Sequence, residues 1–220
     1  MDRSVRITLF VLLLVVVLIF GLVVARQMYL VGGDTPAAPD LAELNVYVYD
    51  EARPVAEFTL TNEYGQPVTR EDLKGHWTFA FVGYTNCPDI CPAAMANLRQ
   101  MDQRLPDDLP QPEYLLISAD PEHDTPERLK AYTHFFGEHF HGLSGDLDTT
   151  RALARSLSAV FVHREVDGEL LVDHSGHFAL LNPQAQVQAL IQPPHRPEAL
   201  AEAYRRIYRW AEARQDRDGA

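Results

Sequence analysis

Residues 7–25, ITLFVLLLVVVLIFGLVVA, form an apolar run without a charged side chain, interrupted only by Thr8 and Gly21. A bilayer core is crossed by a helix of about 20 apolar residues, whereas the apolar part of a cleaved signal has about 7 to 15. No clear small-residue cleavage motif ends the run. We therefore expect residues 7–25 to be a transmembrane anchor.

The charges that flank this run predict its orientation. Arg3, Arg6 and the amino terminus precede it, and Arg26 alone follows it closely. Basic flanks are retained on the cytoplasmic side of a membrane. We therefore expect a single-pass protein of the inner (cytoplasmic) membrane, with residues 1–6 as a short cytoplasmic end and the soluble part facing the periplasm.

The sequence after the anchor divides by composition. Residues 32–40, GGDTPAAPD, have the glycine, proline and alanine content of a tether. The remaining length suits one domain of ordinary size. We therefore expect a linker over 26–40, a folded domain over 41–215 and a short tail over 216–220.

The charge of the chain excludes one class of partner. The formal net charge is −12, and only two of the 19 basic residues are lysines. Such an acidic chain offers no broad basic surface to a phosphate backbone, so we expect no nucleic acid partner.

Patterns typical of strands and helices alternate along the domain. A nearly continuous aromatic and β-branched run over 77–84 is typical of a strand that is buried on both faces. We expect a β ribbon around a turn at 63–66 and strands over 77–84, over 113–120 and near 140–143. Helices are expected over 93–105, from 125, over 148–158 and from 197 to about 214. Between 159 and 191 we expect antiparallel strands with turns at 167–168 and 182–183. This order predicts an α/β fold, a thioredoxin-like sandwich with a central mixed sheet, preceded by the one N-terminal transmembrane helix.

The two cysteines of the chain, Cys87 and Cys91, directly follow the predicted central strand, and each precedes a proline. The residue before a proline is disfavoured in the α region, so we expect both cysteines in extended or turn conformations and a helix that begins at about Pro92. Cys91 would then lie near the N-cap, where the helix dipole favours the thiolate. Two such thiolates can form a disulfide or share a metal ion, and their spacing leaves both open.

A metal held by two thiolates needs a further ligand, and the chain has nine histidines. His174 and His177 are three residues apart and point to opposite faces of a strand, so at most one of them faces the cysteines. On pattern alone, a strand histidine is more often part of a hydrogen-bonded structure than a ligand. The other histidines are not expected to be ligands of this site: His76, His123, His134, His139, His141, His163 and His195.

Four segments of this chain, FVGYTNCPDICP, ISADPEHDTPERLKAYTHFF, HGLSG and VDHSGHFALLNP, are similar in order and spacing to the signature segments of the Sco/SenC copper chaperones of respiratory oxidases. The resemblance implies a thioredoxin-like domain that binds one copper ion through Cys87, Cys91 and His174, while His177 either supports the ligands or is structural. It also implies delivery of the copper to the CuA-bearing subunit of cytochrome c oxidase, with an unidentified copper donor or thiol reductant as a further partner. Thiolates favour Cu(I), and imidazole accepts either oxidation state.

This chain departs from the family pattern at three places. Asn86 stands where the family usually has histidine, His123 stands where arginine is common, and the segment after His174 is more polar. These departures remove no ligand, but they leave open which oxidase is served.

Other functions use the same cysteines. A membrane-tethered thiol:disulfide oxidoreductase that keeps the oxidase cysteines reduced would use Cys87 as the attacking thiolate and Cys91 as the resolving thiol, with a redox-active disulfide between them. A peroxidase of the peroxiredoxin type needs a threonine three residues before its cysteine, whereas Thr85 precedes Cys87 by two. A tethered interaction domain with structural cysteines is the remaining alternative. If the protein is a copper chaperone, we do not expect it to be an enzyme.

Overall fold

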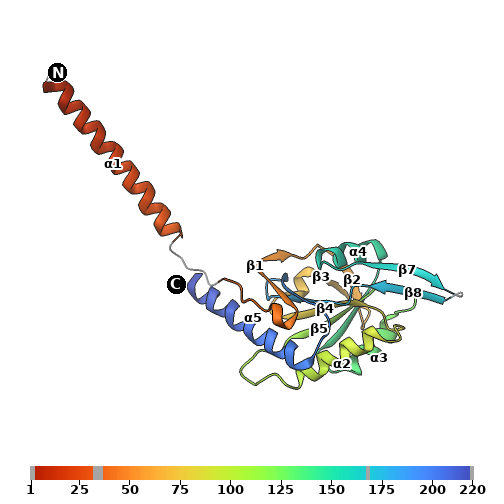
Figure 1. The fold of residues 1–220 in the computed structure, drawn as a ribbon. Coiled ribbons are helices and arrows are strands. Elements are labelled where there is room, and N and C mark those ends of the chain that lie inside the picture. Colours follow the sequence, from red (N-terminus) through yellow and green to blue (C-terminus); the bar gives the residue numbers. More distant parts are fainter. Residues whose placement is uncertain (1–2, 32–36, 167–168, 219–220) are drawn as a thin grey trace. The chain divides into compact units, whose positions relative to one another are not determined.

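The computed structural model describes residues 3–31, 37–166 and 169–218. The chain divides into two compact units, Met1–Ala37 and Ala38–Ala220. Figure 1 shows one long helix in the described part of the first unit and an α/β domain in the second. The mixed sheet of the second unit and the apolar helix of the first confirm the predicted fold class.

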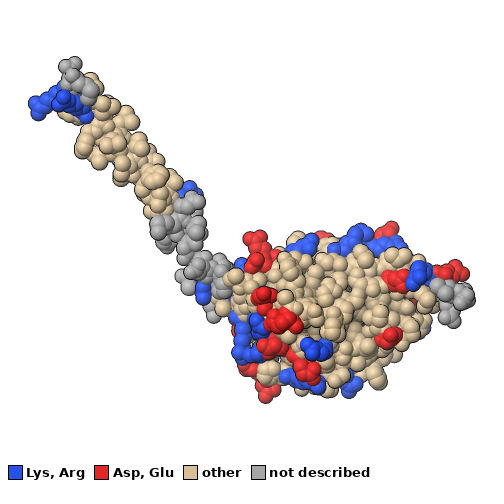
Figure 2. Space-filling view, in the orientation of Figure 1, with Lys and Arg blue, Asp and Glu red and all other residues tan. Residues whose placement is uncertain are grey.

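The first unit contains helix α1 (Arg3–Val31), in which Arg3–Arg26 is long and apolar enough to cross a membrane. Figure 2 shows an uncharged stretch of this helix that lies between basic side chains. The helix continues past residue 25, so residues 26–31 of the predicted linker are helical.

The second unit is built on an eight-stranded mixed sheet in the order β1-β10-β9-β4-β5-β6-β2-β3. Its strands are β1 (Val46–Pro54), β2 (Thr59–Asn62), β3 (Pro67–Thr69), β4 (Thr78–Gly83), β5 (Glu113–Ser118), β6 (Phe140–Ser144), β9 (Phe178–Leu181) and β10 (Gln186–Ile191). Strands β4, β5 and β6 are parallel, and the other neighbours pair antiparallel. The predicted ribbon at 63–66 is the β2–β3 hairpin, and the predicted turn at 182–183 joins β9 to β10.

Helices cover both faces of this sheet. They are α2 (Ile90–Asp102), α3 (Pro126–His134), α4 (Leu147–Ser156) and α5 (Pro197–Asp218), with short 3₁₀ turns at Ala42–Leu44 and Arg70–Leu73. Figure 1 shows α2, α3 and α5 on one face and α4 on the other. The helix predicted from residue 125 is α3, in which Thr125 caps the start by accepting the N–H of Arg128 and Pro126 occupies the first turn.

Strand β4 lies at the centre of the core, and all six of its residues are buried. The ring of Phe79 stacks on Tyr114 of β5 at 5.8 Å, and Tyr114 stacks on Phe140 of β6 at 4.4 Å. Each such buried side chain stabilises the fold by about 1.5–3 kcal/mol relative to exposure. The segment that follows β4 therefore leaves a rigid strand, which fixes the start of the cysteine loop.

Strands β7 (Phe161–Val166) and β8 (Glu169–His174) form a separate two-stranded sheet. The predicted turn at 167–168 lies outside the described residues. Nε2 of His163 donates to the carbonyl oxygen of Ala119, directly after β5, at 2.6 Å. This bond fastens the hairpin to the carboxyl end of the parallel strands, where its last residue, His174, meets the cysteine loop.

Three elements differ most from the predictions: strand β1, helix α5, and helix α2, which spans Ile90–Asp102 instead of 93–105. Strand β1 is absent from the predicted set, because its second half, DEARP, is polar and it lies at the edge of the sheet beside β10. Helix α5 extends to Asp218, four residues past the predicted end at 214.

Candidate metal centre

The two cysteines lie where the central strand leads into helix α2. Strand β4 ends at Gly83 and α2 begins at Ile90, so Cys87 lies in the loop and Cys91 in the first turn of the helix. The predicted helix start at Pro92 is therefore two residues late, and the prediction of an extended or turn conformation is wrong for Cys91. A proline is accepted in the first turn because the N–H groups there have no partner within the helix.

Three potential ligand atoms converge at this point. The sulfur atoms of Cys87 and Cys91 and a ring nitrogen of His174 all lie within 4.8 Å of one another. Nε2 of His174 is 3.2 Å from Sγ of Cys91 and 3.9 Å from Sγ of Cys87. Metal–sulfur and metal–nitrogen bonds of about 2.3 and 2.0 Å let one ion reach atoms up to about 4.3 Å apart. One soft metal ion could therefore contact all three residues.

The ring of His174 is oriented by the residue that follows it. Nδ1 of His174 lies 3.0 Å from the carbonyl oxygen of Ser175. A carbonyl only accepts, so Nδ1 carries a proton, which leaves Nε2 as the ring nitrogen that faces the two sulfur atoms. Ser175 is itself held, since its N–H donates to the carbonyl of Val160 at 2.9 Å and its hydroxyl accepts the Val160 N–H at 3.0 Å.

Aromatic rings enclose the imidazole of His174. The rings of Phe81 and Tyr84 approach it edge-on, with centroids at 5.5 and 6.1 Å. His177 takes a different position: it is buried, and its Nε2 donates to the carbonyl oxygen of Leu157 at 3.1 Å. His177 is thus bonded to the backbone while His174 faces the cysteines.

The sulfur of Cys91 is packed against the backbone of β4. A Cβ atom added at Gly83 would lie 2.8 Å from this sulfur and 3.0 Å from a ring carbon of Phe81. Cys91 is fully buried, so its sulfur has no free space into which to move. A residue without a side chain is therefore required at Gly83 if Cys91 is to keep its place.

The two thiols have opposite electrostatic characters. The thiol of Cys91 donates a hydrogen bond to the sulfur of Cys87, which lowers the pKa of Cys87 and raises the pKa of Cys91. Burial raises the pKa of Cys91 further, because its side chain is 0% exposed while that of Cys87 is 9% exposed. The prediction that the helix start makes Cys91 a thiolate is therefore wrong for the metal-free protein, in which Cys87 is the activated sulfur.

A buried carboxylate that the sequence patterns did not single out holds the loop before Cys87. Asp124 is 1% exposed and accepts hydrogen bonds from the N–H of Thr85 at 3.1 Å and from its hydroxyl at 2.5 Å. The guanidinium of Arg128 donates to the Thr85 hydroxyl at 2.8 Å and also bonds the side chain of Asn86. Asp124 lies in the Asp-Thr-Pro segment, but its partner Thr85 is 39 residues earlier, where a sequence pattern does not reveal it.

Comparisons with known proteins identify the family that this chain resembles. The SCO1/SenC family model matches residues 48–209. A putative copper-binding protein of Stutzerimonas stutzeri is 35% identical over 162 residues, which are 73% of this chain and 79% of that protein. Protein SCO2 of Saccharomyces cerevisiae is 37% identical over 133 residues, which are 59% of this chain and 44% of that protein, so this chain matches less than half of that relative.

Solved structures show the same fold. ScoI of Arabidopsis thaliana, solved with copper bound, superposes with a TM-score of 0.66 at 28% identity, covering 70% of this chain and 98% of that one. BsSco, a member of the Sco family of cytochrome c oxidase assembly proteins in which a disulfide switch has been identified, superposes with a TM-score of 0.58 at 25% identity, covering 73% and 96%. The family match spans well over half of the chain and the fold agrees, so the chain belongs to the SCO1/SenC family.

Proposed function

We propose that this chain is a membrane-anchored copper chaperone that binds one copper ion through Cys87, Cys91 and His174 and delivers it to the CuA centre of cytochrome c oxidase. The proposal is carried by the convergence of two sulfur atoms and an imidazole nitrogen within 4.8 Å. The copper-bound relatives support copper as the ion, and the family to which BsSco belongs supports the oxidase as its destination.

The three ligands suit an ion that must be both held and released. Thiolates favour Cu(I), and an imidazole accepts Cu(I) or Cu(II). Three protein ligands leave copper open to a ligand from the acceptor. Cys91 anchors the ion from the core, whereas Cys87 and His174 lie nearer the surface, where an incoming ligand can replace them.

The anchor sets where this transfer takes place. Basic side chains at Arg3 and Arg6 support a cytoplasmic N-terminus, which leaves the soluble part in the periplasm beside the acceptor. We assign copper binding to a domain over residues 41–215, supported by a compact unit that begins at Ala38 and by the family match over 48–209.

The test is a copper count on the full-length protein in detergent, reduced, loaded with Cu(I) and freed of excess metal. Elemental analysis should find about one copper per chain, and His174→Ala should lose most of it. His123→Ala is the matched control, because this half-exposed histidine bonds Asp120 rather than the cysteines. No retained copper, or a count unchanged by His174→Ala, would contradict the three-ligand site. Delivery is tested by transfer to a metal-free CuA domain, followed by the absorption of its copper centre.

A second function is favoured by the unequal thiols. In this alternative the thiolate of Cys87 attacks a disulfide between the cysteines of the oxidase copper site and forms a mixed disulfide, releasing one oxidase thiol. Cys91 then attacks the mixed disulfide, releasing the second thiol and leaving a Cys87–Cys91 disulfide for an external thiol reductant to reduce. The disulfide switch identified in BsSco supports this role. His174→Ala would leave this exchange intact while abolishing copper retention, which separates the two functions.

A further inference from the structure

A second cluster of titratable side chains lies at the amino ends of the parallel strands, whereas the cysteines lie at their carboxyl ends. Glu113 is the first residue of β5 and pairs with Thr78, the first residue of β4, whereas the cysteine loop follows the last residue of β4. His141 lies in β6, the next strand along. At about 3.3 Å per residue, the two ends of the six-residue strand β4 lie about 20 Å apart. The cluster is therefore separate from the copper-binding centre.

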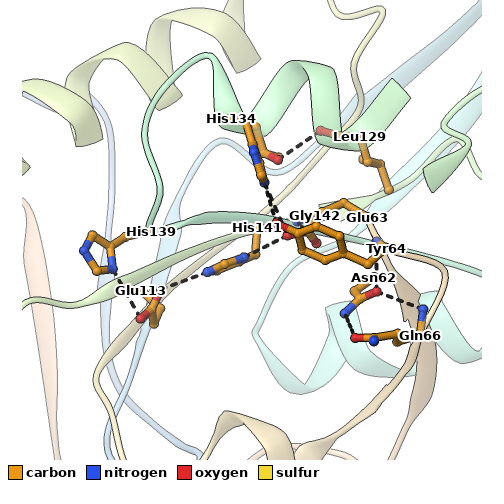
Figure 3. Close-up of polar contacts among 11 residues, drawn as sticks. Asn62, Glu63, Tyr64, Gln66, Glu113, Leu129, His134, His139, His141 and Gly142 are labelled. Atoms are coloured by element: carbon orange, nitrogen blue, oxygen red, sulfur yellow. Dashed lines mark hydrogen bonds and ion pairs between the residues drawn. The ribbon is translucent and has the colours of Figure 1, made fainter. Parts of the chain in front are cut away.

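Two histidines of this cluster face one carboxylate. His139 and His141 are two residues apart, so their side chains lie on the same face, while Phe140 between them is buried in the core. Nδ1 of His139 lies 3.4 Å from Oε1 of Glu113, and Nε2 of His141 lies 3.0 Å from Oε2. Figure 3 shows both rings directed at the Glu113 carboxylate.

The ring of His141 is held from behind by a second carboxylate. Its Nδ1 lies 2.9 Å from Oε1 of Glu63, a residue that is 3% exposed. The other oxygen of Glu63 accepts the N–H of Gly142 at 3.2 Å. A carboxylate that binds one nitrogen of an imidazole fixes the ring and makes the other nitrogen a better metal ligand. Glu63 thus leaves Nε2 of His141 as the nitrogen that faces Glu113.

A cavity of about 250 Å³ adjoins the cluster and has room for water. Its polar lining includes Glu63, Glu113, His141, His76 and Thr78. The hydroxyl of Thr78 is buried and has no hydrogen-bond partner. Buried hydroxyls are normally bonded to protein or to ordered water. The hydroxyl of Thr78, a residue that lines the cavity, is an exception to this rule.

We propose that His139, His141 and Glu113 form a second metal site, which takes a borderline divalent cation such as Zn²⁺ or Cu²⁺. Imidazole and carboxylate suit such ions, whereas Cu(I) prefers the thiolates at the other edge. With metal–ligand bonds of about 2.0–2.1 Å, tetrahedral ligand atoms stand about 3.3–3.4 Å apart. The two nitrogen–oxygen pairs, which are hydrogen-bonded in the metal-free protein, lie 3.4 and 3.0 Å apart, close to this value, so an ion would replace the shared protons. Water in the cavity would complete the coordination.

The side chain of His139 must rotate before all three proposed ligands can contact one ion. Among the described residues, only Cys87, Cys91 and His174 have three ligand atoms already within 4.8 Å of one another. His139 must therefore turn toward His141 when the ion binds. The side chain of His139 is 47% exposed, so its ring has space on the solvent side to make this rotation.

The test uses the full-length protein in detergent, without a polyhistidine tag, carrying Cys87→Ser and Cys91→Ser so that the soft site cannot contribute. After chelation and desalting, Zn²⁺ is titrated by calorimetry and counted by elemental analysis. We expect about one Zn²⁺ per chain and at least a tenfold loss of affinity in His139→Gln and in Glu113→Gln. The proposed copper function plays no part in this background, so the two proposals stand or fall independently.

Three controls make the result decisive. His123→Gln changes another half-exposed histidine and should leave Zn²⁺ affinity unchanged. Because His139 is exposed, His139→Gln should leave the thermal midpoint of the metal-free protein unchanged, which separates ligand loss from unfolding. Glu63→Gln should weaken binding less than Glu113→Gln does. Absence of Zn²⁺ binding, as in a plain ion-pair cluster, or equal losses in His123→Gln and His139→Gln, would overturn the proposal.

Discussion

The buried carboxylate of Asp124 accepts the backbone N–H of Thr85 at 3.1 Å, two residues before Cys87. The same carboxylate accepts the hydroxyl of Ser118, the last residue of β5, at 2.5 Å. Asp124 therefore fastens the cysteine loop to the end of a core strand. Because the proposed copper ligand Cys87 follows this fastened segment, the position of its sulfur depends on a residue that does not touch the candidate metal centre.

Asp124→Asn should lower copper affinity by about 10- to 100-fold, the usual effect of changing a group that orients a metal ligand. The amide would turn an N–H₂ group toward donors, leaving a buried N–H or hydroxyl unpaired at a cost of about 1–3 kcal/mol. The measurement is competition for Cu(I) with a chromophoric chelator. Asp173→Asn is the matched control, since this exposed carboxylate pairs with Arg164 on the surface. Equal losses in both variants would show a general charge effect instead.

Gly83→Ala should destabilise the protein and displace the sulfur of Cys91. The added methyl would lie 2.8 Å from that sulfur and 3.1 Å from Cδ1 of Leu116. Overpacking of this kind costs about 1–3 kcal/mol. Urea unfolding of the metal-free variant measures the loss, and the copper count reports the displaced ligand. A variant with unchanged stability and one bound copper would show that the core can absorb the methyl.

The sequence predicted the parts of this fold and site that depend on local pattern. The apolar run of β4 marked a central strand, and the cysteines after it marked the carboxyl edge of the sheet as the site. The pattern around His174 gave its place on a strand, but its role came from resemblance to a family. Local pattern was sufficient where burial alone decides the structure.

The remaining features depend on contacts between distant segments. The pKa order of the cysteines follows from a hydrogen bond between them and from the full burial of Cys91, which the helix-dipole argument does not include. The cluster at Glu113 brings together residues from three separate segments, around 63, 113 and 139–141, and the sequence of any one segment does not predict it. Strand β1 was not predicted for the same reason. Its second half is polar, and its partner β10 lies far along the chain.

His195 should make the protein less stable as the pH falls below about 6.5. Burial lowers the pKa of His195, whose Nε2 donates to the carbonyl of Ile191 and whose ring stacks on Phe178 at 4.0 Å. Below the ordinary histidine pKa the unfolded chain binds a proton that the folded chain excludes, so stability present above about 6.5 is lost on acidification. The slope from this group is at most about 1.4 kcal/mol per pH unit.

His195→Gln keeps an N–H donor for Ile191 and removes the titration. The variant should be less stable than the unmodified protein at pH 7, because the ring stacked on Phe178 is lost, and this difference should shrink at pH 5. Urea midpoints at both pH values measure the change. A difference that stays constant between pH 7 and pH 5 would mean that another group governs the acid sensitivity.

The two cysteines should differ in their reaction with iodoacetamide in the reduced, metal-free protein. The hydrogen bond from Cys91 keeps Cys87 as a thiolate at pH 6, where an ordinary thiol with a pKa of about 8.5 is protonated and unreactive. Cys91 is fully buried and holds its proton, so it should stay unlabelled. Tandem mass spectrometry of the tryptic peptide 75–99 locates the label. Cys91→Ala removes the donor and should slow the labelling of Cys87 at pH 6 much more than at pH 9. Equal labelling of both cysteines, or a rate at Cys87 that rises tenfold per pH unit from pH 6 to pH 8, would contradict the assigned thiolate.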